Sequence, residues 1–534
     1  SVKTEDGKYM YIKASGTALK DMCQERGWRR LRIEPVLAII KDRSLNKLDA
    51  IARENTVVTR LLDACDDCLT CGARPSVESH LHALLLSHVI HLHPLVVSAY
   101  VNARDGQAQI ARLFAGEKLP PLWVPYADPG YMLARKIAGL VADYQQEHRR
   151  KPQILFLEKH GVFVTADSAN AALRLVRKVI ERCESKLKIF PSPGIKAPAS
   201  EDVAVAKLAI RKAVFDVTGQ YVPVSHYPAT APVAAFMAHR DCRALLAAPA
   251  LHPEELVFAN GPALWVEDTD PARIARGIQS RLARTRKAPY AFIAKGLGLF
   301  IAADKSLAPL AAEMANGSVT VRMHAHRFGG VFGLSRREQE FINNWESEAF
   351  RKKLVGGEGP GELSNRIAVV TGAGSGLGRS IAVGLARAGA LVALTDIDEK
   401  AGRETADIIA RERSKNQAKV IPCNVTSEDS VRAAFQELLA HWGGLDILVN
   451  AAGTTERHPA EEFPAEVFDR ILDVNLRSVF LLTQKVGRVM IAQRSGKVIN
   501  VASVQSELSG RNIAPYTVSK GGIRQLTKAL AAEW

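Results

Sequence analysis

Hydrophobic and polar positions follow two periods along the chain and predict a succession of strands and amphipathic helices. The short apolar run 154–158 (ILFLE) is typical of a buried strand, whereas 169–187 (ANAALRLVRKVIERCESKL) and 338–354 (EQEFINNWESEAFRKKL) carry apolar residues at helical spacing. A Pro- and Ser-rich stretch at 190–200 and a Gly-rich stretch at 355–365 interrupt the pattern as linkers. We therefore expect three units, over residues 1–195, 196–345 and 365–534, with a connecting segment at 346–364.

A short segment recurs between the first and second units. Residues 158–167 (EKHGVFVTAD) align without a gap to 295–304 (KGLGLFIAAD), and the position of His160 becomes Leu297 in the second copy. A repeated strand, turn and strand followed by a helix predicts a duplicated fold with a degenerate second copy. Ten residues can also match by chance, so this alignment alone leaves both interpretations open.

Charge and hydropathy narrow the function classes. Lys and Arg outnumber Asp and Glu by 71 to 56 in the 534 residues, and most of the excess lies in the first two thirds. The chain has no Lys/Arg-rich run with interleaved aromatic residues, which argues against a nucleic-acid partner and fits an anionic small substrate or simply a basic surface. With no apolar run of 18 residues and no signal-peptide pattern, we expect a cytoplasmic protein without a membrane partner.

Two histidines stand in the apolar run at residues 89–95 (VIHLHPL). On a strand, His91 and His93 project to the same face with Leu92 between them. Tetrahedral zinc would need a third imidazole and an open position, and His160, at the head of a glycine turn after a strand, is the best third ligand. From spacing alone, however, hydrogen-bonded core histidines remain the better interpretation.

The pattern of residues 366–398 predicts a buried strand, a glycine-rich turn, a helix and a second strand that ends at an acidic residue. Glycines let backbone N–H groups approach a pyrophosphate at the helix N-terminus, where the helix dipole favours anions. Asp396 can accept hydrogen bonds from the adenosine ribose diol and would repel a 2′-phosphate. Because no Arg or Lys precedes Arg379 in the turn, the sequence favours NAD over NADP.

Further motifs follow this dinucleotide pattern: TGAGSGLG at 371–378, NAAG at 450–453, Asn475, Ser503, and Tyr516 four residues before Lys520. This set resembles the short-chain dehydrogenase/reductase family over residues 365–534. The resemblance implies a Rossmann doubly wound parallel sheet. Tyr516 and Lys520 share one helix face, so the ammonium can lower the phenol pKa and let tyrosinate act as a base.

The resemblance also implies individual roles. Tyr516 would be the general acid/base, Ser503 would hydrogen-bond the substrate oxygen, and Asn475 would support a proton relay. Lys520 would also bind the nicotinamide ribose, and Asn424 would take the adenine-contact place where the family usually has Asp. The implied NAD-binding positions are Gly372, Ser375, Gly376, Leu377, Gly378, Asp396, Ile397, Asn424, Val425, Asn450, Ala451, Gly453, Tyr516 and Lys520. The family continues with two further strands, so we expect an incomplete sheet edge and a chain that is a fragment at both ends.

A second resemblance covers residues 1 to about 185. The stretch 72–99 (GARPSVESHLHALLLSHVIHLHPLVVSA), followed by 157–164 (LEKHGVFV), resembles the class II aldolase/adducin family. The resemblance implies an α/β/α domain with a zinc ion and a catalytic acidic residue, Glu78. The implied zinc ligands are His91, His93 and His160, and the implied phosphate-binding positions are Ser15, Gly16 and Ser76. The other histidines of this stretch are expected on a helix surface or at the edge of the core: His80, His82 and His88.

Together the units resemble the bifunctional group that joins rhamnulose-1-phosphate aldolase to lactaldehyde dehydrogenase. Zinc would act as a Lewis acid on a ketose while Glu78 shuttles a proton, and the NAD unit would oxidise the released aldehyde. The expected partners are therefore small sugar phosphates and aldehydes, and we also expect a homo-oligomer. Two other interpretations stay open: a sugar or polyol dehydrogenase with a scaffold front half, and a non-enzymatic adducin-like interaction module.

A cysteine cluster, CDDCLTC, places three of the seven cysteines at CxxCxxC spacing. A zinc or iron–sulfur site would need a fourth ligand, and no further CxxC follows. We expect reduced thiols in a polar loop at Cys65, Cys68 and Cys71.

Overall fold

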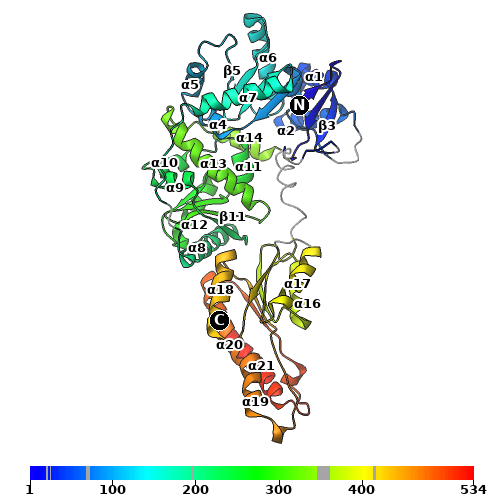
Figure 1. Cartoon of the computed structure of the whole chain (residues 1–534), viewed down its shortest axis with the longest axis vertical. Coiled ribbons are helices and arrows are strands. Elements are labelled where there is room, and N and C mark those ends of the chain that lie inside the picture. The colour runs from blue at the N-terminus through cyan, green and yellow to red at the C-terminus, as the bar shows by residue number, and fades with distance from the viewer. Residues whose placement is uncertain are drawn as a thin grey trace.

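The computed structural model describes residues 1–17, 19, 22–24, 26–67, 73–194, 197–345, 361–412 and 417–534. Three α/β units follow one another along the long axis of the molecule, with the second unit between the first and the third (Figure 1). Cys68 and Cys71 lie outside the described residues. Within the described ranges, no helix combines the length and hydrophobicity that a membrane span requires.

The first unit is built on a mixed sheet that, among the described residues, has seven strands in the order β3-β2-β1-β4-β7-β6-β5. Residues of β6 and β7 alternate between two cores, because successive side chains of a strand point to opposite faces. Helices therefore cover both faces. The strands are β1 (Val2–Lys3), β2 (Tyr9–Lys13), β3 (Trp28–Arg32), β4 (His88–Leu92), β5 (Leu122–Val124), β6 (Ile154–Leu157) and β7 (Val162–Ala166). The helices are α1 (Ile33–Lys41), the 3₁₀ helix η2 (Arg43–Lys47), α2 (Ala50–Asp63), α3 (Ser79–Leu84), α4 (Leu95–Val101), α5 (Gly106–Leu113), α6 (Tyr131–His148) and α7 (Ala169–Glu184).

The second unit has a smaller sheet, in the order β8-β11-β10-β9 over the strands that the structure describes. Its strands are β8 (Val224–Tyr227), β9 (Leu264–Val266), β10 (Ala291–Ala294) and β11 (Gly298–Ala302). Its helices are α8 (Ser200–Thr218), α9 (Ala231–Ala238), α10 (Cys242–Ala247), α11 (Pro253–Ala259), α12 (Pro271–Thr285), α13 (Ala308–Arg327) and α14 (Arg336–Asn344). The charged helix expected over 338–354 thus begins and ends earlier, and residues 346–354 lie outside the described ranges.

The two sheets share one arrangement of strands, as a duplicated fold would. In both, a central hairpin (β6–β7 and β10–β11) pairs antiparallel with an earlier strand on one side and parallel with a short strand on the other. The short parallel strands even share the sequence LWV. The first unit adds an extension that the described second unit lacks, made of β1 to β3 and α1 to α3.

The third unit is a parallel sheet, in the order β14-β13-β12-β15-β16 over its described strands, as predicted for a doubly wound fold. Chain order reverses between β12 and β15, so ligands of such sheets bind beside the carboxyl ends of these two strands. The strands are β12 (Ile367–Thr371), β13 (Leu391–Asp396), β14 (Ala418–Pro422), β15 (Ile447–Asn450) and β16 (Lys497–Asn500). The helices are α16 (Gly376–Arg387), α17 (Glu399–Glu412), α18 (Glu428–Trp442), η4 (Ala460–Glu462), α19 (Ala465–Leu472), the π-helix η5 (Asp473–Arg477), α20 (Ser478–Gln493), η6 (Val504–Ser506) and α21 (Ala514–Glu533).

The second and third units are joined by buried polar contacts from α8. Arg211 donates to the Asp446 carboxylate at 2.6 Å, and both side chains are almost fully buried. The same carboxylate oxygen accepts the backbone N–H of Ile367 at 2.7 Å, at the start of β12. Lys207 donates to the backbone carbonyls of Ala440 and His441 at the end of α18. These contacts fix the second unit against the dehydrogenase-like sheet.

Candidate functional site

Three histidine rings of the first unit converge on one point. His91 comes from β4, His93 follows that strand directly, and His160 comes from the turn between β6 and β7. The Nε2 atoms of His91 and His93 are 2.9 Å apart, and one ring nitrogen from each of the three lies within 4.8 Å of the others. This is the set predicted from the HxH spacing and the later His-Gly pair.

Two of the rings are oriented through their Nδ1 atoms. His91 Nδ1 lies 3.1 Å from the carbonyl of Val162, and His93 Nδ1 lies 3.3 Å from the carboxylate of Glu254. If both Nδ1 atoms donate to these acceptors, both Nε2 lone pairs face each other, which is favourable only with a cation near them. Tetrahedral zinc with bonds of 2.0–2.1 Å separates its nitrogens by about 3.3 Å, so small ring shifts would accommodate it. The residues present therefore fit a zinc ion.

Burial keeps the third imidazole neutral, as a metal ligand must be. Desolvation lowers the pKa of His160 to about 3, and Glu78 opposes that shift. The Glu78 carboxylate lies 3.3 Å from His160 Nε2 and 3.5 Å from His91 Nε2, at the N-terminus of α3. An acidic group thus stands beside the point where the imidazoles converge.

The glycine after His160 is required by close packing. A Cβ at Gly161 would lie 2.4 Å from the His93 ring and 2.5 Å from the Leu92 carbonyl. Any larger residue would displace His93 or the end of β4.

The expected phosphate-binding positions form one local cluster. The Ser15 N–H donates to the carbonyl of Arg74 at 2.8 Å, and Ala14 pairs with Pro75 in an isolated bridge. The Ser76 hydroxyl accepts the N–H of Glu78 at 3.3 Å, which links this cluster to the histidine site. Gly16 has φ of 78°, a conformation that favours glycine.

Two histidines outside the set are more buried than expected. His80 is fully buried, and neither of its ring nitrogens has a hydrogen-bond partner among the described residues. His82 is also buried, and its Nδ1 lies 2.9 Å from the Ser1 hydroxyl. A helix-surface position is therefore wrong for both, because the short helix α3 packs against α1 and α6 and is buried along most of its length. His88, half-buried at the start of β4, fits the core edge.

Two residues of the second unit were missed by sequence reasoning. Glu254, in the first turn of α11, contacts His93, and no motif marks it. His226 is the counterpart of His91, because β8 sets it opposite Phe300 just as β4 sets His91 opposite Phe163. The strand VSHYP could have indicated this position if β8 had been aligned to β4.

In the third unit, the glycine-rich turn closes tightly on the first strand. A Cβ at Gly378 would lie 2.1 Å from the carbonyl of Gly372, and Gly372 itself has φ of 65°. The N–H of Gly374 donates to the Asp396 carboxylate at 2.8 Å. The turn and the acidic end of β13 are thereby held together at the N-terminus of α16, where an anion is favoured.

The rim of this turn carries exposed apolar side chains. Leu377 and Ile397 are 67% and 75% exposed at the two sides of this turn. Asn424 lies beyond β14, and its side-chain oxygen already accepts two hydrogen bonds from Thr426. The remaining predicted rim residues, Ser375, Gly376 and Val425, lie in the same loops, with Ser375 as the N-cap of α16.

The NAAG motif supports the turn from the neighbouring strand. The Thr371 hydroxyl accepts the N–H groups of Ala451 and Ala452, each at 3.0 Å. The Asn450 side chain donates to Thr483 and to Asn500, so it ties β15 to α20 and β16. Gly453 lies against the next cluster, since a Cβ there would be 3.8 Å from Lys520 Nζ.

The predicted catalytic residues lie around the start of α21. Asn475 is fully buried on a π-helical turn, where its amide bonds both backbone groups of Thr454 at 2.8 Å and the Ser519 hydroxyl at 3.1 Å. Lys520 Nζ donates to the carbonyl of Val501 at 2.7 Å and lies 5.8 Å from the Tyr516 ring centre. Burial lowers the pKa of Lys520. Ser503 caps η6, and its hydroxyl accepts the N–H of Gln505.

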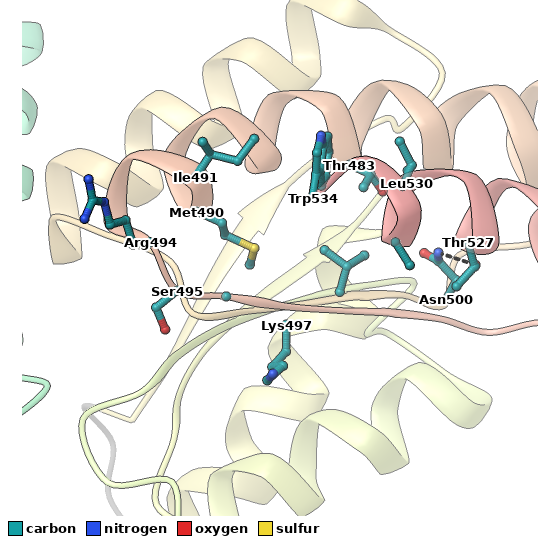
Figure 2. Close-up of a pocket in the computed structure, with 13 residues that line it drawn as sticks. Thr483, Met490, Ile491, Arg494, Ser495, Lys497, Asn500, Thr527, Leu530 and Trp534 are labelled. Atoms are coloured by element: carbon teal, nitrogen blue, oxygen red, sulfur yellow. Dashed lines mark hydrogen bonds between the residues drawn. The ribbon is translucent and has the colours of Figure 1, made fainter.

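The third unit also has a pocket away from the predicted catalytic residues. A pocket of about 800 Å³ runs beside the edge strand β16 and is lined by Met490, Ile491, Leu530 and Trp534 (Figure 2). Thr527, which also lines it, is about three helical turns from Tyr516 on α21. This pocket is therefore separate from the predicted catalytic residues.

Comparison with known families agrees with this division. The family model described as "Class II Aldolase and Adducin N-terminal domain" matches residues 1–187, and the model described as "short chain dehydrogenase" matches residues 366–534. The uncharacterized oxidoreductase YuxG of Bacillus subtilis (strain 168) is 25% identical over 98% of this chain and 78% of its own length. An aldolase-type unit and a dehydrogenase unit are thus both present.

Shorter relatives match the third unit alone. The 2-dehydro-3-deoxy-D-gluconate 5-dehydrogenase of Pseudoalteromonas atlantica is 37% identical over 32% of this chain and 67% of its own length. A solved gluconate 5-dehydrogenase from Burkholderia cenocepacia J2315, in complex with NADP and tartrate, is 41% identical over 32% of this chain and 67% of its own, with a TM-score of 0.31. The chain spans about two thirds of the length of such dehydrogenases. It belongs, in its third unit, to the short-chain dehydrogenase family, here fused to a class II aldolase and adducin N-terminal domain.

Proposed function

We propose that the protein is a bifunctional enzyme that cleaves a deoxyketose 1-phosphate and oxidises the aldehyde released. Rhamnulose 1-phosphate is the substrate we favour, with dihydroxyacetone phosphate and lactaldehyde as products. The sugar itself is inferred from the resemblance of the fused units, since no residue of the site recognises a particular deoxy carbon.

One observation carries the lyase half of the proposal. Three imidazoles converge within 4.8 Å beside the Glu78 carboxylate, an arrangement that a mere scaffold does not need. A bound zinc would supply Lewis-acid polarisation of a ketose carbonyl and its neighbouring hydroxyl. Glu78 would move the proton at the substrate carbon or hydroxyl, and the cluster around Ser15, Gly16 and Ser76 would bind the phosphate.

The oxidoreductase half depends on the groups at the start of α21. Tyr516 would hold or move the proton at the substrate oxygen, and Ser503 would hydrogen-bond that oxygen. Lys520 would bind the nicotinamide ribose, while the buried Asn475 fixes the Thr454 backbone beside it. An aldehyde is oxidised as its hydrate, which forms by addition of water, so Tyr516 would take a hydroxyl proton of the hydrate while bound NAD would supply the hydride acceptor.

The preference for NAD over NADP follows from Asp396. Its carboxylate oxygens accept the backbone N–H groups of Gly374 and Asp398, at 2.8 and 3.0 Å, which holds the carboxylate beside the glycine-rich turn. Arg379, the first cation after the glycine-rich turn, is bound to the Gly374 carbonyl and to Glu404. A 2′-phosphate would thus meet a fixed anion and an Arg that is already paired.

The test is to add rhamnulose 1-phosphate to the full chain with NAD and to follow NADH. We expect NADH formation that is lost on zinc chelation and in Tyr516→Phe. Chelation should leave NAD binding intact, because the two sites lie in different units. Loss of NAD binding on chelation would contradict the two-site proposal.

A second candidate is favoured by the names of the relatives. Several curated relatives of the third unit act on sugar acids or polyols, among them gluconate 5-dehydrogenase of Gluconobacter oxydans and D-threitol dehydrogenase of Mycolicibacterium smegmatis. The third unit would then oxidise a secondary alcohol of a polyol, independently of zinc. NADH formation from polyols by the zinc-free protein, with none from the sugar phosphate, would favour this candidate.

A further inference from the structure

The histidine site of the first unit is completed by the second unit. Glu254, at the start of α11, points one carboxylate oxygen at His93 Nδ1, 3.3 Å away, and the other at His252 Nδ1, 3.1 Å away. Its side chain is only 15% exposed. This carboxylate thus bridges a predicted zinc ligand in one unit and a histidine in the other.

A second contact reaches the turn that carries His160. Lys159, next to it, is buried in the left-handed conformation with φ of 56°. Its ammonium donates to the Glu338 carboxylate on α14 at 3.0 Å and lies 4.1 Å from the ring centre of Phe332. Glu338 and Phe332 belong to the second unit, while the ring centre of Tyr126, in the first unit, lies 5.1 Å from the ammonium.

Among its described residues, the second unit has no comparable histidine set. At the positions of His93 and His160 it carries Pro228 and Leu297, and the imidazole at the position of His91, His226, is bonded through Nε2 to the Leu297 carbonyl at 2.8 Å. The polar groups that it directs towards the first unit are therefore not remnants of a second metal site.

We propose that the second copy serves as the outer shell of the metal site in the first copy, with Glu254 as a positioning residue for His93. A carboxylate that accepts the Nδ1–H of a ligating histidine fixes the tautomer and aims Nε2 at the metal. Such outer partners typically contribute 10–100-fold in metal affinity. This inference rests on the proposed zinc site, and it gives the degenerate copy a function in the lyase half.

Two conservative variants of the full chain test separately the length of the Glu254 side chain and its negative charge. Glu254→Asp keeps the charge in the first turn of α11, which suits the helix dipole, but withdraws the acceptor by one methylene. Glu254→Gln keeps the reach and an acceptor oxygen but removes the charge. If Glu254 positions His93, the Asp variant should bind zinc 10–100-fold more weakly, and the Gln variant should stay within roughly threefold of wild type.

Zinc affinity is measured by competition with a chromogenic chelator, and the unfolding of the metal-free proteins is measured alongside. Glu340→Asp is the matched control, because Glu340 lies exposed on α14 and pairs with Arg336 one turn away. Equal zinc affinity in wild type and Glu254→Asp would overturn the positioning role and leave the zinc site standing. A wild-type chain that binds no zinc would overturn the proposed lyase site as well.

Discussion

The first and second units share one strand arrangement but differ at two of the three histidine positions. Both place a hairpin between an antiparallel and a parallel neighbour, and both split the alternating residues of that hairpin between two cores. The two copies differ at the positions of two predicted zinc ligands, one just after the strand that precedes the hairpin and one in the hairpin turn. The hydrophobic pattern that specifies the sheet is therefore independent of the few polar positions that make the site.

A second difference between the two copies is the extension of the first copy. Strands β1 to β3 and helices α1 to α3 belong to the first copy alone, and they bring Glu78 and the Ser15 cluster beside the histidines. Restoring two histidines to the second copy would thus not be enough to give it an acid/base group.

The largest expected effect tests whether the imidazoles of the two copies are equivalent. His160→Ala removes one of three ligands and should weaken zinc binding by about 3–4 kcal/mol, or several hundredfold, since structural zinc sites gain about 10–16 kcal/mol from their whole ligand set. His226→Ala, the control in the second copy, should leave zinc affinity unchanged. Both are measured by chelator competition, and equal losses in the two variants would contradict the assignment.

Sequence reasoning recovered the elements whose pattern is local. The HxH strand, the His-Gly turn, the glycine-rich turn and the Tyr516 helix all formed where they were predicted, because each depends on strand or helix periodicity and on glycine conformation. Glu254 could not be predicted, because its contact with His93 spans 161 positions and depends on how two units pack. The burial of His80 was missed for a different reason, because a helix of six residues shows no clear pattern that indicates which face is covered.

The next effect concerns the extension and its buried acid. Glu54 on α2 is 2% exposed, and burial raises its pKa to about 7. Because the folded pKa lies above the usual value, its contribution to stability is full below about pH 4.5 and is lost as the pH rises through 7. The unfolding free energy should fall by on the order of 3 kcal/mol over that window.

Glu54→Gln should abolish this part of the pH dependence and stabilise the protein at pH 8. Denaturant unfolding at pH 5 and pH 8 measures it, with Glu181→Gln on the exposed face of α7 as the control. A wild-type stability that does not change between these values relative to Glu54→Gln would show that the extension does not carry the buried acid as described.

Two equivalent glycines give a smaller and more selective effect. Gly161→Ala would drive a methyl group into His93 and the Leu92 carbonyl, at a cost of about 1–3 kcal/mol in stability and with weaker zinc binding. Gly298→Ala meets strain instead, since its φ is 107°, and should cost about 1–3 kcal/mol without touching zinc affinity. Denaturant unfolding and chelator titrations of both variants compare the two copies at one equivalent position. Loss of zinc affinity in Gly298→Ala would contradict the expected difference between them.

The smallest expected effect concerns a hydrogen bond to a proline carbonyl, which a different type of side chain makes in each copy. Tyr144 donates to the Pro120 carbonyl at 2.9 Å in the first copy, and Arg281 donates to the Pro262 carbonyl at 2.9 Å at the matching place in the second. Tyr144→Phe should cost about 1 kcal/mol, because the carbonyl loses its donor. Arg281→Met loses the same bond but also removes a cation whose pKa burial lowers to about 10, so its cost in denaturant unfolding should be the smaller of the two. A larger cost for Arg281→Met would mean that the second copy depends on this charge, and that the two copies are stabilised differently at a position where their backbones agree.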